Sequence, residues 1–235
     1  MDSASLVFRM QQSAARLLDH RYYLDTTATL GRDEYGCRDG ERSKEPSRWL
    51  TLTVALPRRW VTCDDVLAEI GCGEGKIVVQ AARYPFKRVI GVERFHQPAA
   101  IARANVTKAR HVRAKETEIF TADATTWRPP DDLTIVYHCN SVQGERFRAM
   151  LRQLKRLVDR RGQPLRIIYI NPVEHQILLD DPQVSELTPP PDFLVRLTGH
   201  PSRYIRRYLL SPREQSRQTP RAIPRFTTGA EPDHR

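Results

Sequence analysis

Three glycines alternate in the short segment 71–75 (Gly-Cys-Gly-Glu-Gly), and this segment constrains the fold more than any other part of the chain. The apolar residues 66–70 precede it as in a buried strand, and residues 77–82 follow it with the pattern of a packed helix. A strand, a tight glycine turn and a helix are the context in which a glycine-rich motif binds a ligand. Gly71 lets the chain leave the strand abruptly, and the two later glycines let backbone N–H groups approach a ligand closely.

The spacing and charge of this loop indicate which ligand it suits. A dinucleotide-binding loop has the pattern G-x-G-x-x-G and places a pyrophosphate at the N-terminus of the following helix. Here the third glycine comes one position early, and Lys76 stands where that glycine is expected. Glu69 and Glu74 would also repel a pyrophosphate. The loop therefore favours a cationic or zwitterionic ligand and disfavours a nicotinamide oxidoreductase.

The rest of the chain alternates between predicted strands and helices. Strands are expected at 65–70, 88–93, 117–121, 133–138 and 165–170, and helices at 47–56, 75–84, 97–111, 143–159 and 173–180. Strands separated by helices of this length favour a parallel sheet with right-handed crossovers, and continuous apolar strands indicate that both faces of the sheet are covered. After three consecutive prolines at 189–191, residues 193–197 and 204–210 are expected to form an antiparallel hairpin.

The pattern E-x-G-x-G-x-G from Glu69 to Gly75 resembles motif I of the class I S-adenosylmethionine-dependent methyltransferases. Glu93 ends the predicted second strand, and Asp123-Ala124 follows in the third segment, in the order and spacing of that family. Similar segments cover residues 60–175, and the stretch 69–82 is also similar to the non-SET-domain histone-lysine methyltransferases. The resemblance implies an α/β, Rossmann-like fold with a mostly parallel twisted sheet, helices on both faces and the antiparallel hairpin at its C-terminal edge.

The same resemblance implies the cofactor S-adenosyl-L-methionine and the residues that hold it. Glu93 would accept hydrogen bonds from both ribose hydroxyls, and the Asp123 carboxylate would meet the adenine amino group. Trp127 is a candidate for stacking on the adenine ring, with plain core packing as the alternative. The cofactor-binding residues implied in this way are Glu69, Gly71, Gly73, Gly75, Glu93, Asp123 and Ala124.

Segment 137–142 lies where the family keeps the residues nearest to the reaction. Amino-methylating branches have Asp or Asn followed by two prolines and an aromatic residue, whereas this chain keeps Asn140 and continues with Ser141 and Val142. Asn140 is predicted to accept a hydrogen bond from a substrate amine or hydroxyl, although the altered motif does not support a planar amine or nucleobase as acceptor. His138 is the second catalytic candidate, as a general base for a hydroxyl, with a structural role as the alternative.

Charge leaves two functional interpretations open. The chain carries 38 Lys and Arg against 28 Asp and Glu, a net charge of +10, with much of the excess in segment 146–161. This charge fits a nucleic-acid partner, but it fits better the arginine-rich composition that a GC-rich genome produces without selection for binding. We therefore expect a methyltransferase with an unidentified acceptor, with a catalytically silent cofactor-binding protein that has a basic surface as the alternative. The side chains of Lys76, Arg94 and His96 are expected on the surface.

Three regions are expected along the chain: an N-terminal helical cap and lid (1–60), the methyltransferase core (61–211) and a disordered basic tail (212–235). Residues 4–20 have the pattern of an amphipathic helix. Residues 21–27 resemble an R-Y-G-x-D-T segment that precedes the core in a group of bacterial methyltransferases.

Cysteine spacing and hydropathy bear on metals and location. The four cysteines form no C-x-x-C pair and no cysteine–histidine cluster with zinc spacing, so no metal site is expected. No apolar run approaches the roughly 20 residues that a membrane-spanning helix needs. Residues at the start of the sequence lack a continuous apolar segment of signal-peptide type, so we expect a cytoplasmic protein without a membrane partner.

Overall fold

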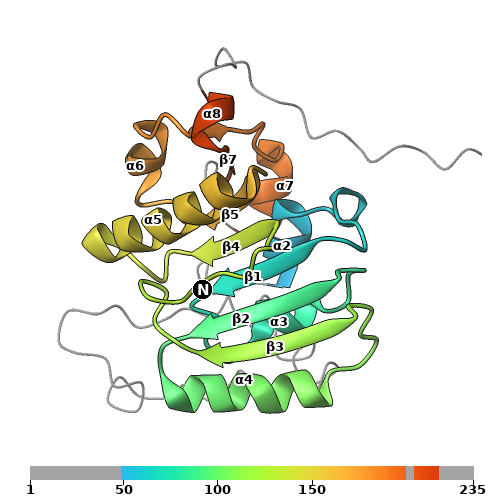
Figure 1. Cartoon of the computed structure of the whole chain (residues 1–235). Helices are drawn as coiled ribbons and strands as arrows, with labels where there is room; N and C mark the ends of the chain where they lie inside the picture. The colour runs from blue at the N-terminus through green and yellow to red at the C-terminus, as the bar shows by residue number, and fades with distance from the viewer. Residues whose placement is uncertain (1–48, 200–203, 217–235) are drawn as a thin grey trace, which may run out of the picture.

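The computed structural model describes residues 49–199 and 204–216 of the 235-residue chain (Figure 1). Within these residues, seven strands form one sheet in the order β3-β2-β1-β4-β5-β7-β6. The strands are β1 (Val66–Ile70), β2 (Arg88–Glu93), β3 (Glu116–Thr121), β4 (Ile135–Cys139), β5 (Leu165–Ile170), β6 (Val184–Glu186) and β7 (Ile205–Leu210). The helices are α2 (Trp49–Ala55), α3 (Lys76–Ala81), α4 (His96–Lys108), α5 (Gly144–Arg161), α6 (His175–Leu179), α7 (Asp192–Leu197) and α8 (Arg213–Ser216), with a 3-10 turn η1 at Arg58–Trp60.

The order of the strands reverses between β1 and β4. From β1 the chain steps outward to β2 and β3, then returns to place β4 on the other side of β1, and all of these pairs, like β4 with β5, are parallel. The arrowheads of β1 to β4 therefore point to the same edge of the sheet (Figure 1). In an open sheet of this kind, ligands bind beyond the carboxyl ends of the strands, at the reversal. The predicted α/β fold with a mostly parallel sheet is confirmed.

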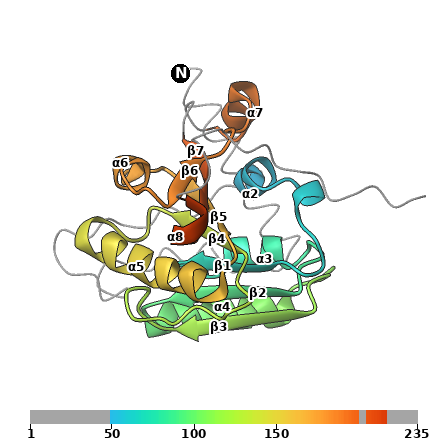
Figure 2. The same ribbon diagram turned by 45° about the horizontal axis from the view of Figure 1, so that its top comes forward.

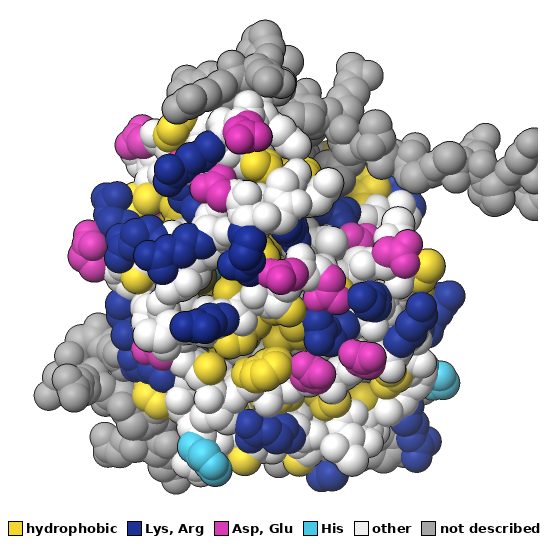
Figure 3. Space-filling view, viewed as in Figure 1, with side chains coloured by type: hydrophobic (Ala, Val, Ile, Leu, Met, Phe, Trp, Pro, Cys, Tyr) yellow, Lys and Arg dark blue, Asp and Glu magenta, His cyan; other side chains and the backbone are white. Residues whose placement is uncertain are grey.

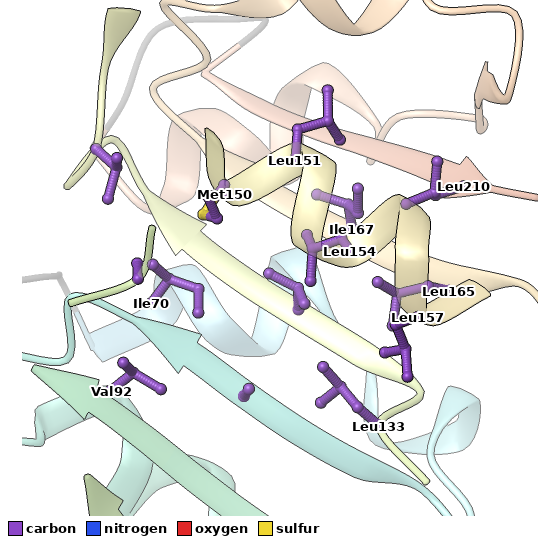
Figure 4. Packing of buried hydrophobic residues seen from close by; sticks show 14 of the residues in the cluster. Ile70, Val92, Leu133, Met150, Leu151, Leu154, Leu157, Leu165, Ile167 and Leu210 are labelled. Atoms are coloured by element: carbon purple, nitrogen blue, oxygen red, sulfur yellow. The ribbon is translucent and has the colours of Figure 1, made fainter. Parts of the chain in front are cut away.

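Helices cover both faces of the sheet, as the apolar strands predicted. Figure 1 shows α5 in front of the strands and α3 behind them, and Figure 2 shows α2 and α7 together on one side. On the α5 side, apolar residues one turn apart on the helix pack onto the strands (Figure 4). These α5 residues are Phe147, Met150, Leu151, Leu154, Leu157 and Val158. Burial of each leucine stabilises the fold by about 1.5–3 kcal/mol, so α5 is firmly held on the sheet.

The antiparallel closure of the sheet is confirmed, but the predicted partner strand is wrong. Residues 193–197 form most of helix α7, and the strand that pairs with β7 is the three-residue β6. Pro191, at φ −54° and ψ 136°, is the N-cap residue of this helix, and Asp192 supplies an acidic side chain in its first turn. Phe193 and Leu197 suggested a buried strand, but both side chains are exposed.

The two edges of the sheet differ in character. β3 is the edge strand on one side, and its side chains are half-buried or exposed, with Glu116 and Glu118 among them. β6 forms the opposite edge and is only three residues long. In the described part of the chain, no helix is long and apolar enough to cross a membrane.

Several predicted segments lie outside the described residues. They are the helix at 4–20, the segment 21–27 with the loop that follows it, and the tail from 217 onward. The start of the predicted disordered tail differs from expectation, because α8 contacts the end of α5. The backbone N–H of Arg213 donates to Asp159 at 3.0 Å, and the Gln215 amide donates to the Gly162 carbonyl at 3.2 Å. Polar contacts thus hold a stretch without an apolar pattern, which the composition did not reveal.

Candidate active site

The glycine loop leaves β1 by passing directly over the end of β4. Gly71 has φ +71°, and its N–H donates to the Val92 carbonyl at 2.7 Å. A Cβ added to Gly71 would lie 2.3 Å from the Ser141 Cβ, far inside van der Waals contact. The Ser141 hydroxyl in turn donates to the Ile70 carbonyl at 2.6 Å. Glycine is therefore required here for space as well as for backbone conformation.

The other two glycines meet different surroundings. Gly75, at φ +82°, precedes α3, and an added Cβ would lie 3.0 Å from the Ala102 Cβ of α4. Gly73, at φ +53°, would point an added Cβ to where no atom of residues 49–199 or 204–216 lies within 4 Å. The backbone at Gly73 thus borders a space beside the carboxyl edge of the sheet. This position is the one where the sequence predicted a close approach of ligand to backbone.

Two buried polar side chains hold the loop from its flanks. Glu93, at the end of β2, is 1% exposed; its Oε2 accepts the Gly73 N–H at 2.9 Å and its Oε1 accepts the Phe95 N–H at 3.0 Å. From α4, the buried Asn105 amide donates to the Glu74 carbonyl at 2.9 Å. The predicted pair of Glu93 and Gly73 is therefore in direct contact. Asn105 is a supporting residue that the sequence analysis missed.

The remaining residues around the loop differ in burial from one another. Glu69 is buried in β1, opposite Gly91 of β2 and Tyr137 of β4. Lys76 was expected on the surface and is instead 7% exposed, because α3 packs against both β1 and α4. Arg94 is half-buried, whereas His96 is exposed as expected.

Asp123 follows β3 at the same edge of the sheet. Its Oδ1 accepts the N–H and the hydroxyl of Thr125 at 2.9 and 2.8 Å, and its Oδ2 accepts Arg146 of α5 at 2.9 Å. Burial opposes ionisation of this carboxyl, but the bonds from Thr125 and Arg146 outweigh it and lower its pKa. Asp123 is therefore a carboxylate at neutral pH. The following residue, Ala124, is buried in the α5-side core.

Trp127 belongs to the same core cluster as Ala124. Its side chain is 9% exposed, and its ring lies at a tilt to Phe120, with 6.4 Å between the ring centroids. Of the two alternatives for Trp127, core packing is the one that the structure shows.

His138 lies at the end of β4 and is completely buried. Its ring packs against Tyr169 and Phe147, with centroids 4.7 and 5.7 Å away, and its Nδ1 lies 3.1 Å from the Ser141 hydroxyl. Because the single Ser141 hydrogen goes to Ile70, the Nδ1 of His138 is assigned as the donor to Ser141, which in a neutral ring leaves the lone pair on Nε2. Burial lowers the pKa of His138 to about 4. This environment suits a structural histidine, and its role as a general base stays a prediction.

Asn140, one residue after β4, is held in the left-handed region at φ +47°. The Tyr169 hydroxyl donates to the Asn140 Oδ1 at 3.3 Å and itself accepts the Glu174 N–H at 3.3 Å. Glu174 also accepts the Gly144 N–H, at 2.6 Å, which links this group to the start of α5. Burial raises the pKa of Tyr169, so it remains a hydroxyl donor at neutral pH. Tyr169 was not among the predicted site residues. The signal that could have identified it is a single tyrosine within the apolar strand Ile-Ile-Tyr-Ile.

A separate pocket lies away from the strand ends. It has a volume of about 1000 Å³ and lies between α2, η1, the end of α3 and the proline segment 189–191. None of the predicted site residues lines it. Within the described residues, no group of three or more His, Cys, Asp or Glu side chains is arranged to hold a metal ion.

Comparison with known families agrees with this arrangement. Residues 67–162 match the family model described as a methyltransferase domain. The match runs from β1 to the end of α5 and contains every predicted site residue. The chain contains a class I methyltransferase domain. Members of this family use S-adenosylmethionine as the methyl donor, as the resemblance of the glycine loop implied. No curated protein matches this methyltransferase chain in sequence.

Solved structures of methyltransferases are similar at low identity. An RNA methyltransferase from Salinibacter ruber in complex with S-adenosyl-L-homocysteine is 18% identical, with 77% of this chain and 99% of that chain covered and a TM-score of 0.48. An rRNA methylase from Streptococcus thermophilus is 13% identical, with 74% and 100% covered and a TM-score of 0.44. A dimethyladenosine transferase from Plasmodium falciparum is 14% identical, with a TM-score of 0.47 and 72% of this chain covered. The match spans 63% of the transferase, which is less than two thirds of its length. Similarity at this level does not identify a substrate for this chain.

Alanine substitutions at Gly71 and Gly73 distinguish the effect of a steric clash from the effect of backbone strain, because both residues have positive φ. Gly71→Ala places a Cβ against Ser141 and should destabilise the fold by several kcal/mol, because backbone on both sides must move. Gly73→Ala adds a Cβ in open space and should cost only the about 1–2 kcal/mol of a left-handed alanine. Urea denaturation of both variants measures the difference. Equal losses of stability would show that the loop does not pass over β4 as described.

The neutral buried His138 predicts a loss of stability in mild acid. The unfolded chain binds a proton at an ordinary pKa of 6.5, whereas folded His138 binds one only near pH 4. Its contribution is therefore fully present above pH 6.5 and is lost progressively as the pH falls to about 4, by about 3 kcal/mol in total. Denaturation at a series of pH values in wild type and His138→Asn measures this. The variant should show a shallower slope in this window, and an unchanged slope would contradict the assignment.

Proposed function

We propose that this domain binds S-adenosylmethionine across the carboxyl ends of β1, β2 and β3 and methylates an acceptor held beside Asn140. The observation that carries the proposal is the open space in front of Gly73, bordered by the buried carboxylate of Glu93. The Gly73 N–H donates to this carboxylate, so a ligand bound against the Gly73 backbone would lie next to it. When bound, S-adenosylmethionine supplies a methyl group on a positively charged sulfur, which the acceptor takes by in-line displacement.

Glu93 has acceptor capacity for a ribose. A carboxylate has about four lone-pair sites, and the N–H groups of Gly73 and Phe95 use two of them. The two ribose hydroxyls of the cofactor would donate to the same carboxylate. Glu69 and Glu93 together make the region acidic, which favours the positive sulfonium and ammonium groups of this ligand over a pyrophosphate.

Asp123 is the candidate partner of the adenine amino group, and Arg146 shares its Oδ2. The adenine amino group would share this oxygen or displace Arg146 from it. The Arg146 side chain is 45% exposed, and an exposed ion pair contributes about 0–1 kcal/mol. Because a charge-assisted hydrogen bond contributes about 1.5–3 kcal/mol, the exchange favours the ligand.

Asn140 is the candidate for orienting the acceptor. The Tyr169 hydroxyl fixes its amide from one side, and the Asn140 NH₂ group and the second lone pair of its Oδ1 remain available to a substrate. The altered motif lacks the prolines of amino-methylating relatives, and the Tyr169 contact supplies rigidity in their place. His138 lies beneath Asn140 and, being buried and neutral, would serve the acceptor only through a rearrangement of this group.

Cofactor binding is tested by titration calorimetry with S-adenosylhomocysteine. Glu93→Ala removes two charge-assisted bonds of about 1.5–3 kcal/mol each and should weaken binding by two orders of magnitude or more. Glu93→Gln keeps one acceptor oxygen and should fall between this variant and wild type. Glu116→Ala, at the start of the β3 edge strand, removes an exposed carboxylate of the same sheet as a control and should leave binding unchanged. Wild-type affinity in Glu93→Ala would contradict the proposed ribose site.

Methyl transfer is tested by incubating the protein with tritiated S-adenosylmethionine and a cell extract, then counting label in macromolecules. Asn140→Gly removes the amide yet tolerates the left-handed backbone, so turnover should fall at least tenfold while cofactor affinity is kept. Asn171→Gly is the matched control, since Asn171 has φ +52° after β5. An absence of label transfer by wild type despite cofactor binding would favour the catalytically silent alternative. Equal activity in the two variants would remove Asn140 from the site.

A further inference from the structure

The exposed face of α5 carries a row of arginines that the proposed cofactor site does not use. Seven of the 18 residues of α5 are basic and two are acidic. Arg148, Arg152 and Arg156 are exposed and follow one another at four-residue intervals, so they lie on one side of the helix, about 6 Å apart along its axis. Figure 3 shows Lys and Arg side chains gathered over α5. We refer to these three residues as the arginine row.

The row differs from the other basic side chains of α5, which bond to acidic side chains or, for Arg161, to backbone carbonyls. Among the described residues, no acidic side chain pairs with Arg152 or Arg156, and Arg148 reaches only the exposed Glu145 of its own helix, at 3.3 Å. The paired side chains are Arg146 with Asp123, Lys155 with Asp181 and Arg160 with Asp131. The positive charge of the row is thus not neutralised within the described part of the protein.

The position of the row connects it to the proposed site. α5 begins at Gly144, four residues after Asn140, and Arg146 in its first turn contacts Asp123. The row therefore starts beside the carboxyl edge of the sheet and leads away from it along the helix. A long anion lying on the row would end close to Asn140.

We infer that the arginine row binds the phosphodiester backbone of a nucleic acid and leads it toward Asn140. Arginine pairs with phosphate through charge-assisted bonds, and charges repeated at each helical turn suit a ligand whose charges also repeat. A membrane-binding helix would place large apolar side chains beside its basic ones. On α5 the large apolar residues face the core, and the exposed large hydrophobic residues of the described chain all lie on other elements. The inference that the nucleic acid is the acceptor rests on the proposed function; the inference that it binds does not.

Fluorescence anisotropy with a fluorescein-labelled 20-nucleotide single-stranded RNA, alone and as its duplex, tests the inference. Dissociation constants are measured for the full chain over a series of salt concentrations. Arg152→Gln/Arg156→Gln should weaken binding and reduce the slope of log affinity against log salt by about 1.4 for the single strand, the value for two lost phosphate contacts. The control is Arg113→Gln/Arg196→Gln, which removes two exposed arginines outside α5. It lowers net charge equally and should leave the slope unchanged.

The outcomes separate this inference from the proposed function. Equal slopes in the two double variants would overturn it, because the binding would then follow net charge alone. Binding of phosphatidylserine vesicles or polyglutamate through Arg152 and Arg156, with neither oligonucleotide bound, would also overturn it. Titration of the same variants with S-adenosylhomocysteine should give wild-type affinity. A protein that binds RNA through the row but no S-adenosylhomocysteine would contradict the proposed function and leave the binding surface intact.

Discussion

The whole carboxyl edge of this sheet depends on the close passage of the glycine loop over the end of β4. There is no room for a side chain at Gly71, because Ser141 occupies the space that its Cβ would need. The Ser141 hydroxyl bonds to the last carbonyl of β1, and the His138 ring bonds to the same hydroxyl. The glycine loop after β1 and the segment after β4 are thus joined by one serine. A displacement of the glycine loop should therefore also displace the segment after β4, because the two are in van der Waals contact.

The sequence predicts the parallel core well because its strands are continuous apolar segments bounded by turns. The bounds expected for strands 88–93 and 165–170 agree with β2 and β5. The glycine loop, Glu93 and Asp123 were placed from their order along the chain, and the structure brings them to one edge. Periodicity fails at the C-terminal side. β6 has only three residues, and of the apolar residues of α7 Phe193 and Leu197 are exposed while Val195 is buried, so neither element has a clear apolar pattern.

Contacts between distant segments were beyond the reach of such patterns. Nothing next to Lys76 in the sequence shows that its side chain will be buried. Likewise, Tyr169 reaches Asn140 across 29 positions, and Arg146 reaches Asp123 across 23. Tyr169 and Arg146 occupy some of the hydrogen-bonding atoms of Asn140 and Asp123. The sequence therefore predicts which residues lie at the site better than it predicts which of their atoms can bind a ligand. His138 illustrates the difference, because its residue type suggested a base and its burial makes it neutral.

The two edges of the sheet also bear on how this protein keeps apart from its own copies. An exposed edge strand offers unpaired N–H and C=O groups to any extended chain, and long apolar edges promote aggregation. Here one edge ends in the three-residue β6, and the other, β3, carries Glu116 and Glu118. Two copies that met along β3 would bring like charges together at the distance of neighbouring strands. A short edge strand on one side and acidic side chains on the other thus both oppose extension of this seven-stranded sheet from molecule to molecule.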